Sequence, residues 1–470
     1  MARKNKKRKI ISKVFTIILL IINLLFFGLT FILNVIPMKY MIIIIGVFVL
    51  IDILTIILLF SKKRFKRIIG IILSIILSII MLLGSLYEFN TIDFFGNFNK
   101  NNYKTLNYNI LILKSSDYDE IKDLKNKRIG LLKDEHYIEV IKNIKDKISF
   151  KEQNYNNITE LLMNLIDEKL EAVIIEESQY TILTEENSDY SEILKTLHTF
   201  SLDIEVENFD KAVDVTKKPF NIYISGIDSY GKITSVSRSD VNIVATVNPN
   251  THDIVLTSIP RDYYVRLHGT TGYKDKLTHA GVYGIEKSVE TIEDLLEIDI
   301  NYYIKVNFTS LIKIVDLLGG ITVNSNYSFI SLDGYHYNKG YNNLNGKEAL
   351  SFVRERKAFK DGDRVRGENQ QLVLEAIINK ALSPKIITKY NSLLNALDNS
   401  FVSNMDNSDI TSLIKKQIND NPSWNFSTIN LNGTDAYDYT YSYSANKLYV
   451  MIPDEESLKN AQEKLANILN

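Results

Sequence analysis

The first ninety residues of the chain contain three long apolar runs, separated by short polar or basic segments. The runs cover residues 14–36, 41–60 and 68–87. Each is close to the ~20 residues that an α-helix needs to cross a bilayer. The pattern therefore predicts a membrane anchor of three transmembrane helices over residues 1–90.

The charges between these runs predict the orientation of the anchor. Residues 1–9 and 61–67 are strongly basic, whereas residues 34–40 contain a single lysine. Because cytoplasmic loops are enriched in Lys and Arg, we expect a multi-pass protein of the cell membrane with a cytoplasmic N-terminus and extracellular C-terminal domains. No small-residue cleavage site follows the first run, which argues against a signal peptide. Asp52 lies inside the second run, where we expect it to face a neighbouring helix or to be protonated.

The following segment, residues 100–206, alternates short apolar strands with helical stretches. Strand patterns occur at residues 109–115, 127–133, 148–153 and 172–178, and helical patterns at 137–144 and 158–170. This alternation predicts a parallel sheet with crossover helices. Residues 123–132 also resemble the start of an extracytoplasmic solute-binding lobe. We therefore expect a small α/β accessory or partner-binding domain.

A polar linker, residues 206–218, precedes a larger domain that we expect to cover residues 219–470. Its first strands alternate apolar and polar positions at residues 220–228, 240–248 and 253–262. Helical patterns follow at residues 285–296, 310–318, 366–382 and 455–469, with a strand at 302–308 between the first two. The fold class is α/β, with a mixed or partly antiparallel sheet.

Charged residues stand at the ends of the first three strands of this domain. Sequential strands usually pair as neighbours, so the chain is expected to run up, down and up again. Asp228, Asp240 and Arg261 would then lie together at one edge of the sheet.

Further cations follow in pairs that share one face of an element. Arg354 and Arg356 are two residues apart, which on a strand places both side chains on the same face. Arg366 and Gln370 are four apart on a predicted helix, with Arg366 in its first turn, where free N–H groups favour an anion. A solvated strand face is an equally good interpretation of the first pair.

The overall charge makes this cluster more informative. Lys and Arg nearly balance Asp and Glu in the whole chain, but the anchor is basic, which leaves a net charge of about −12 after residue 90. Two carboxylates beside several arginines suit a pyrophosphate, held by Mg²⁺ on one side and by guanidinium groups on the other. The chain has no cysteine, which excludes disulfides and thiolate metal sites. His252, His268 and His279 lack the spacing of a zinc site and are expected to be loop and packing residues.

Several motifs of the larger domain resemble the LytR–CpsA–Psr family. They occur in the family's order: NIYISGIDS at 221–229, RSD at 238–240, SIPRD at 258–262, KLTHAGVYG at 276–284, YYIKVNF at 302–308, VDLLGGITV at 315–323, LNGKEALSFVRERK at 344–357 and DGDRVRGENQQLV at 361–373. The three-helix anchor with an inserted accessory domain is most similar to the CpsA-like, capsule-associated branch.

The resemblance implies a function and a set of site residues. It implies an Mg²⁺-dependent transferase that moves a glycopolymer, expected to be capsular polysaccharide, from an undecaprenyl-pyrophosphate carrier to peptidoglycan in Gram-positive bacteria. By motif, Asp228 and Asp240 match the Mg²⁺ ligands. The pyrophosphate-binding set matches Arg238, Arg261, Lys276, Arg354, Arg356, Arg366 and Gln370. One departure is Asn369, where many members have arginine.

The implied mechanism assigns roles within this set. Arg261, Arg354 and Arg356 are the candidates for stabilising the leaving polyprenyl phosphate, and Asp240 for assisting deprotonation of the acceptor. The carrier's hydrocarbon tail is expected in an apolar cavity between the sheet and the helices.

Two alternatives remain open from the sequence. One is a lipid-pyrophosphate hydrolase, and the other a membrane regulatory protein that binds lipid-linked glycan without turnover. The expected cytoplasmic part is too small for a DNA-binding domain, so we expect no nucleic-acid partner.

Overall fold

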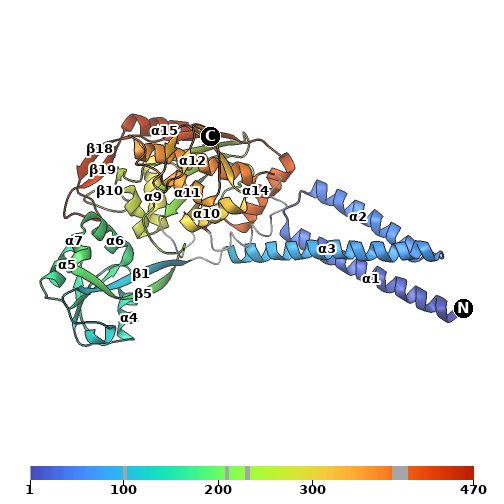
Figure 1. Ribbon diagram of the computed structural model, residues 1–470, viewed down its shortest axis with the longest axis horizontal. Helices are drawn as coiled ribbons and strands as arrows, with labels where there is room; N and C mark the ends of the chain where they lie inside the picture. Colours follow the sequence, from blue (N-terminus) through green and yellow to red (C-terminus); the bar gives the residue numbers. More distant parts are fainter. Residues whose placement is uncertain (1, 99–102, 207–210, 228–232, 384–400, 470) are drawn as a thin grey trace.

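The computed structural model describes residues 2–98, 103–206, 211–227, 233–383 and 401–469. Three long N-terminal helices project from two α/β units that pack against each other (Figure 1). The anchor helices are α1 (Ala2–Leu33), α2 (Met38–Leu59) and α3 (Arg64–Phe98). Each contains a stretch long and apolar enough to cross a membrane, as predicted.

Polar side chains connect the anchor helices inside the bundle. Asp52 of α2 is buried and accepts a hydrogen bond from the Nδ2 amide of Asn23 on α1. Ser12 Oγ of α1 donates to the carbonyl of Leu59 at 2.6 Å. Asp52 therefore faces a neighbouring helix, which confirms one of the two environments expected for it.

The accessory unit is a five-stranded sheet in the order β3-β2-β4-β1-β5. Its elements are β1 (Tyr103–Leu113), η1 (Ile121–Leu124), β2 (Arg128–Leu132), α4 (Tyr137–Lys145), β3 (Lys151–Tyr155), α5 (Ile158–Ile166), β4 (Ala172–Glu176), α6 (Glu177–Glu186), α7 (Asp189–Ile193) and β5 (Leu194–Glu205). Apolar residues of β1 alternate between two cores, Ile110 and Ile112 packing with α4 and Leu111 with α5 and α6.

The prediction of a parallel sheet is correct only for part of this unit. Strands β2, β3 and β4 are parallel, but β1 runs antiparallel to both β4 and β5. The reason is the connection to the rest of the chain: β1 enters and β5 leaves the unit at the same end, so the two strands must run in opposite directions.

The larger unit is built on a six-stranded mixed sheet in the order β16-β11-β6-β7-β8-β17. Strands β6, β7 and β8 form the predicted antiparallel meander, and β11 and β17 pair in parallel with β6 and β8. The strands of this unit are β6 (Phe220–Ile227), β7 (Val241–Asn248), β8 (Asp253–Ser258), β9 (Tyr264–Val265), β10 (Asp275–Lys276), β11 (Tyr302–Asn307), β12 (Ile321–Ser325), β13 (Phe329–Ile330), β14 (His336–Tyr337), β15 (Gly340–Leu344), β16 (Phe401–Ser403), β17 (Asn425–Asn430), β18 (Gly433–Asp438) and β19 (Leu448–Pro453).

Helices cover both faces of this sheet (Figure 1). One face packs against α9 and α15 around a core that includes Tyr223 and Leu465. The other face is covered by α10, α12 and α14. The helices of this unit are α8 (Leu277–Ala280), η2 (Gly281–Tyr283), α9 (Ile285–Leu296), α10 (Phe308–Leu317), α11 (Gly346–Arg354), α12 (Gly362–Ala381), α14 (Asn407–Asp420) and α15 (Glu455–Leu469). The helices predicted at residues 285–296 and 455–469 are confirmed with those bounds.

The two α/β units share backbone bonds and an apolar contact. The amide of Thr105 on β1 donates to the carbonyl of Thr234 at 3.0 Å, and the amide of Val236 donates back to Thr105 at 3.1 Å. Val282 and Leu448 of the larger unit also belong to a core of the accessory unit. The accessory unit is thus seated on the larger one.

Candidate functional site

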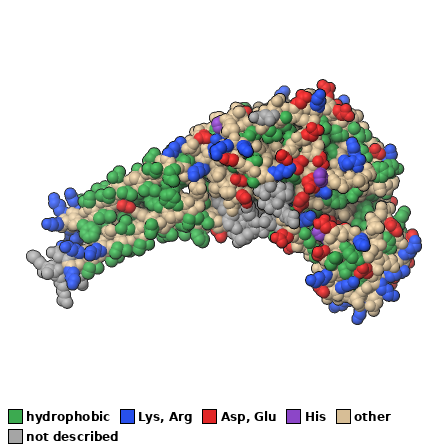
Figure 2. Space-filling model, turned by 180° about the vertical axis from the view of Figure 1, so that it is seen from behind, with side chains coloured by type: hydrophobic (Ala, Val, Ile, Leu, Met, Phe, Trp, Pro, Cys, Tyr) green, Lys and Arg blue, Asp and Glu red, His purple; other side chains and the backbone are tan. Residues whose placement is uncertain are grey.

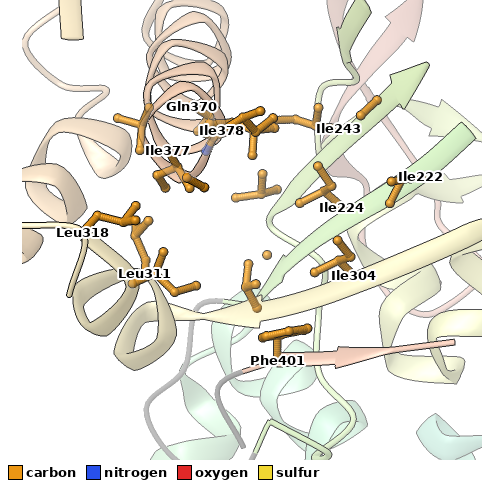
Figure 3. Close-up of a pocket in the computed structure, with 18 of the residues that line it drawn as sticks. Ile222, Ile224, Ile243, Ile304, Leu311, Leu318, Gln370, Ile377, Ile378 and Phe401 are labelled. Atoms are coloured by element: carbon orange, nitrogen blue, oxygen red, sulfur yellow. The ribbon is translucent and has the colours of Figure 1, made fainter. Parts of the chain in front are cut away.

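A large cavity lies between the sheet of the larger unit and the helices α10, α12 and α14 (Figure 3). Its volume is about 1640 Å³, which exceeds the ~300–1,000 Å³ of ordinary small-molecule pockets. The side chains that line its interior are mainly aliphatic. Figure 3 labels Ile222, Ile224, Ile243, Ile304, Leu311, Leu318, Ile377, Ile378 and Phe401 among them.

The alternation of the strands explains why the cavity is lined by isoleucine. Ile222 and Ile224 of β6 point to this face and remain partly exposed, whereas Tyr223 between them points to the opposite core and is fully buried. Ile304 continues the same row on β11, which pairs with β6 in register. The sheet therefore presents a continuous aliphatic wall.

Charged residues gather at one end of this cavity. Asp240, at the start of β7, accepts a hydrogen bond from Arg261 Nη1 at 2.9 Å and one from Thr278 Oγ1 at 3.2 Å. The predicted meander brings Asp240 and Arg261 together, as the sequence indicated. Asp228 lies outside the described residues.

Arg261 is held by several carboxylates. Its Nε lies 3.4 Å from Asp262 Oδ2. Burial alone would lower its pKa, but the attraction of Asp240, Asp262 and Asp363 outweighs burial and raises it. The guanidinium is therefore a fixed positive charge at the edge of the cavity.

Arg354 and Arg356 line the cavity, but the expectation that they lie on a strand is wrong. Arg354 is the last residue of α11, and Arg356 follows that helix. The helix begins at a capping box in which Asn345 and Glu348 bond each other's backbone N–H groups. The Arg354 guanidinium lies 4.5 Å from the centre of the Phe308 ring, which orients it beside the cavity.

Arg366 and Gln370 extend from one face of α12, as predicted, but Arg366 is not in the first turn. The helix begins one turn earlier, at Gly362. Arg366 Nη2 pairs with Asp363 Oδ1 at 3.1 Å. Burial lowers the pKa of Arg366, and the nearby Arg261 lowers it further, against the attraction of Asp363.

The opposite face of α12 is fixed to the sheet. The buried Gln371 donates through Nε2 to the carbonyls of Leu256 and Ile429, at 2.8 and 2.9 Å. Gly367 permits the close approach, because a Cβ there would lie 2.7 Å from Ser258 Oγ. Asn369, the departure from the family pattern, donates to the Phe352 carbonyl at 3.3 Å and is not among the residues lining the cavity.

Arg238 and Lys276 do not line the cavity but face the accessory unit. The guanidinium of Arg238 pairs with Glu185, and Lys276 Nζ lies 2.9 Å from Glu186 Oε1. Both carboxylates stand at the C-terminal end of α6. Lys276 is also 3.9 Å from Asp262, so Asp262 connects it to the arginine end of the cavity.

Sequence reasoning missed four acidic residues around this site, two of which, Glu185 and Glu186, belong to the accessory unit. Asp262 and Asp363 lie within the motifs at 258–262 and 361–373, one and three residues from Arg261 and Arg366, so this proximity was a signal that could have identified them. Glu186 is ninety residues from its partner Lys276, and no local pattern signals that contact.

The described residues contain no group of three or more His, Asp or Glu side chains that could hold a metal ion. His279 Nδ1 bonds the buried Asp275 at 2.7 Å, His268 Nδ1 bonds Asp294 at 2.8 Å, and His252 packs edge-on against Trp424. The bonds to Asp240 from Arg261 and Thr278 both use Oδ1. Among the described residues, no hydrogen bond to Oδ2 is seen, so this oxygen would suit a metal that keeps several waters and takes phosphate ligands.

Comparison with known proteins gives concordant matches. The model of the LytR_cpsA_psr family matches residues 181–467. The chain is 40% identical over 198 residues to the polyisoprenyl-teichoic acid–peptidoglycan teichoic acid transferase TagU of Bacillus subtilis, which covers 42% of this chain and 63% of that protein. TagU of Enterococcus faecalis is 36% identical over 260 residues, covering 54% of this chain and 81% of that protein.

A crystal structure of B. subtilis TagU aligns with 54% of this chain and 98% of its own, at 33% identity and a TM-score of 0.43. The sequence match to the B. subtilis relative, like that to TagU of Bacillus licheniformis, spans 63% of the relative's length.

Proposed function

Because the chain belongs to the LytR–CpsA–Psr family, we propose that it transfers a phosphate-linked glycopolymer from a polyprenyl-pyrophosphate carrier to peptidoglycan at the outer face of the membrane. The relatives named above are teichoic acid transferases that use a polyisoprenyl-linked donor, which supports this class of reaction. The polymer that we propose is capsular polysaccharide, because the anchor and accessory domain resemble the capsule-associated branch.

The observation that carries the proposal is the composition of one continuous cavity. At one end it is lined by Arg261, Arg354, Arg356, Arg366 and Gln370, and along the rest mainly by aliphatic side chains; the lining also includes the carboxylates Asp240, Asp333 and Glu355. A polyprenyl pyrophosphate has the same two parts, an anionic headgroup and a long hydrocarbon tail. Guanidinium groups bind phosphate with two parallel hydrogen bonds, and aliphatic walls bury the tail away from water at ~25 cal/mol per Å² of apolar surface.

The reaction that follows is a phosphoryl transfer. A hydroxyl oxygen of the acceptor attacks the phosphorus that carries the glycan, and the bond from that phosphorus to the bridging oxygen breaks. The polyprenyl monophosphate leaves with the electron pair. The developing charge lies at the arginine end, where Arg261, held by Asp240, and the cavity-lining Arg354 and Arg356 stabilise it. The proton of the hydroxyl passes to the Asp240 carboxylate.

Mg²⁺ would be held by Asp240 and Asp228 and would neutralise part of the pyrophosphate charge. Arg238 and Lys276 complete the proposed pyrophosphate set once Glu185 and Glu186 release them.

The proposed orientation in the membrane places the accessory and larger domains outside the cell. In support of it, Lys and Arg gather at the end of the helical stem that lies away from these domains (Figure 2).

The test uses the full chain in lipid nanodiscs with Mg²⁺ and undecaprenyl-pyrophosphate oligosaccharides of capsular and teichoic type. Mass spectrometry follows undecaprenyl monophosphate and the glycan coupled to peptidoglycan fragments. We expect coupling that requires the acceptor and stops with EDTA, and faster coupling of the capsular donor. Release that is independent of acceptor would identify a hydrolase, and bound but intact lipid would identify a regulator.

A further inference from the structure

The cavity does not end inside the larger domain. Its lining continues along the anchor helices, to the ends that lie next to the globular domains. The residues involved are Thr30 and Leu33 at the end of α1, Val35 and Ile36 in the turn after it, and Tyr87, Glu88 and Thr91 on α3. One space therefore joins the arginine end to helices that have the length and composition of membrane spans.

Helix α14 forms the wall between the cavity and the anchor. Leu413, Ile414, Gln417 and Ile418 of this helix line the cavity. Two polar contacts fix it to the turn after α1 and to the start of α2: Lys415 Nζ donates to Asn34 Oδ1 at 2.9 Å, and Lys39 Nζ donates to the carbonyl of Asn419 at 3.1 Å. In Figure 1, α14 lies beside the start of α2.

The apolar side chains at this junction are incompletely covered by protein. Ile418 is 43% exposed and Tyr87 is 50% exposed. Apolar groups left open between a cavity and membrane helices are stabilised when hydrocarbon covers them, because no water has to be ordered around them. The junction thus suits a hydrocarbon chain that lies partly in the bilayer and partly in the protein.

We propose that the isoprenoid tail of the carrier enters the cavity sideways from the bilayer, through the opening between α14 and the ends of α1 and α3. This membrane portal is lined by Leu33, Val35, Ile36, Tyr87, Ile414 and Ile418. The inference rests on the proposed function and adds the route: the tail passes laterally from the bilayer into the cavity and stays in apolar surroundings throughout, while the pyrophosphate and its glycan remain at the polar arginine end.

The absence of cysteine from the chain allows a reversible test. In the full chain in nanodiscs, Ile418→Cys is coupled to a bulky aromatic methanethiosulfonate, which a reducing agent later removes. Two donors are compared: one with the full undecaprenyl chain in the bilayer, and a water-soluble one with a short prenyl chain. Met38→Cys, at the exposed first position of α2 and not lining the cavity, is the matched control.

We expect the label at position 418 to lower the ratio of long-chain to short-chain turnover by about tenfold or more, equivalent to ~1.4 kcal/mol. Removal of the label should restore the ratio, which excludes misfolding, and the label at position 38 should leave it unchanged. An unchanged ratio in labelled Ile418→Cys, with both donors turned over by the wild type, would overturn the portal alone. Failure of the wild type to turn over either donor would overturn the proposed function, and this inference with it.

Discussion

At the scale of single residues, the site depends on positive charge held in fixed positions. Arg261 is fixed by Asp240, and Arg366 by Asp363. Arg356 lies at the exposed edge of the same cavity. Such an exposed cation contributes little to folding but stands where an anionic leaving group would form.

The first prediction concerns Arg356→Ala. We expect turnover to fall by about 10²–10³-fold, the cost of removing one preorganised donor from a developing negative charge. The measurement is the rate of undecaprenyl monophosphate release by the full chain. Lys360→Ala, exposed nearby but not lining the cavity, is the control and should retain its rate. Equal rates for wild type and Arg356→Ala would remove this arginine from the mechanism.

A second prediction follows from Glu176, at the end of β4. Burial raises the pKa of this carboxyl to about 7, with a smaller contribution from Asp134. In the unfolded chain it titrates near ~4.3. The folded state therefore loses stability as the pH rises from about 4.5 to about 8, because the buried carboxyl must ionise, and the loss amounts to at most ~4 kcal/mol.

Glu176→Gln should remove this pH dependence. Hydrogen–deuterium exchange of the peptide covering β4 and α6, corrected for intrinsic rates, measures local stability across the pH range. Wild type should lose protection relative to Glu176→Gln as the pH increases, whereas Glu192→Gln, at an exposed position on α7, should follow the wild type. Parallel curves for wild type and Glu176→Gln would contradict the raised pKa.

At the scale of elements, the helix α11 determines where Arg354 stands. The side chain of Asn345 accepts from the amide of Glu348 at 3.0 Å, and Glu348 Oε2 accepts from the amide of Asn345 at 2.8 Å. These two bonds fix the first turn, and the helix then ends at Arg354. The orientation of Arg354 thus depends on the cap at the opposite end of its helix.

Asn345→Ala should weaken this helix. We expect a loss of about 1 kcal/mol of stability. Turnover should decrease more than lipid binding, because the positive charge of Arg354 remains but its position is disturbed. Thermal unfolding and steady-state kinetics measure the two effects. Asn345→Ser keeps a capping oxygen and should restore both; if it fails to do so, the amide acts in some other way.

The same elements mark how far the sequence predicts the fold and the site. The neighbouring positions of Asp240 and Arg261 were predictable, because consecutive strands usually pair and only the meander had to be assumed. Arg354 and Arg356 were misassigned because two residues in alternation resemble a strand, although the capping residues Asn345 and Glu348 indicate a helix. The start of the helix that carries Arg366 was predicted one turn too late, because Gly362 is a poor signal for a helix start.

At the scale of the whole molecule, the accessory domain contacts two of the predicted site cations. Glu185 and Glu186 place two negative charges against Arg238 and Lys276. No sequence pattern predicts this arrangement, because it depends on how two domains pack. Its consequence is electrostatic: the carboxylates reduce the positive potential that the proposed pyrophosphate substrate would meet, and they occupy donors of Arg238 and Lys276.

The last prediction is that Glu185→Gln combined with Glu186→Gln raises the affinity for undecaprenyl pyrophosphate by about two- to tenfold, or ~0.4–1.4 kcal/mol. The domains should stay together, because the Thr105 backbone bonds and the apolar contact of Val282 remain. Binding is measured on the full chain in nanodiscs at several salt concentrations, and the difference should shrink as salt screens the charges. Glu177→Gln combined with Glu192→Gln removes the same charge elsewhere on the accessory domain and should change affinity less. If the Glu185/Glu186 pair instead weakens binding, the two carboxylates support the site by orienting Arg238 and Lys276, and their role is positioning rather than competition.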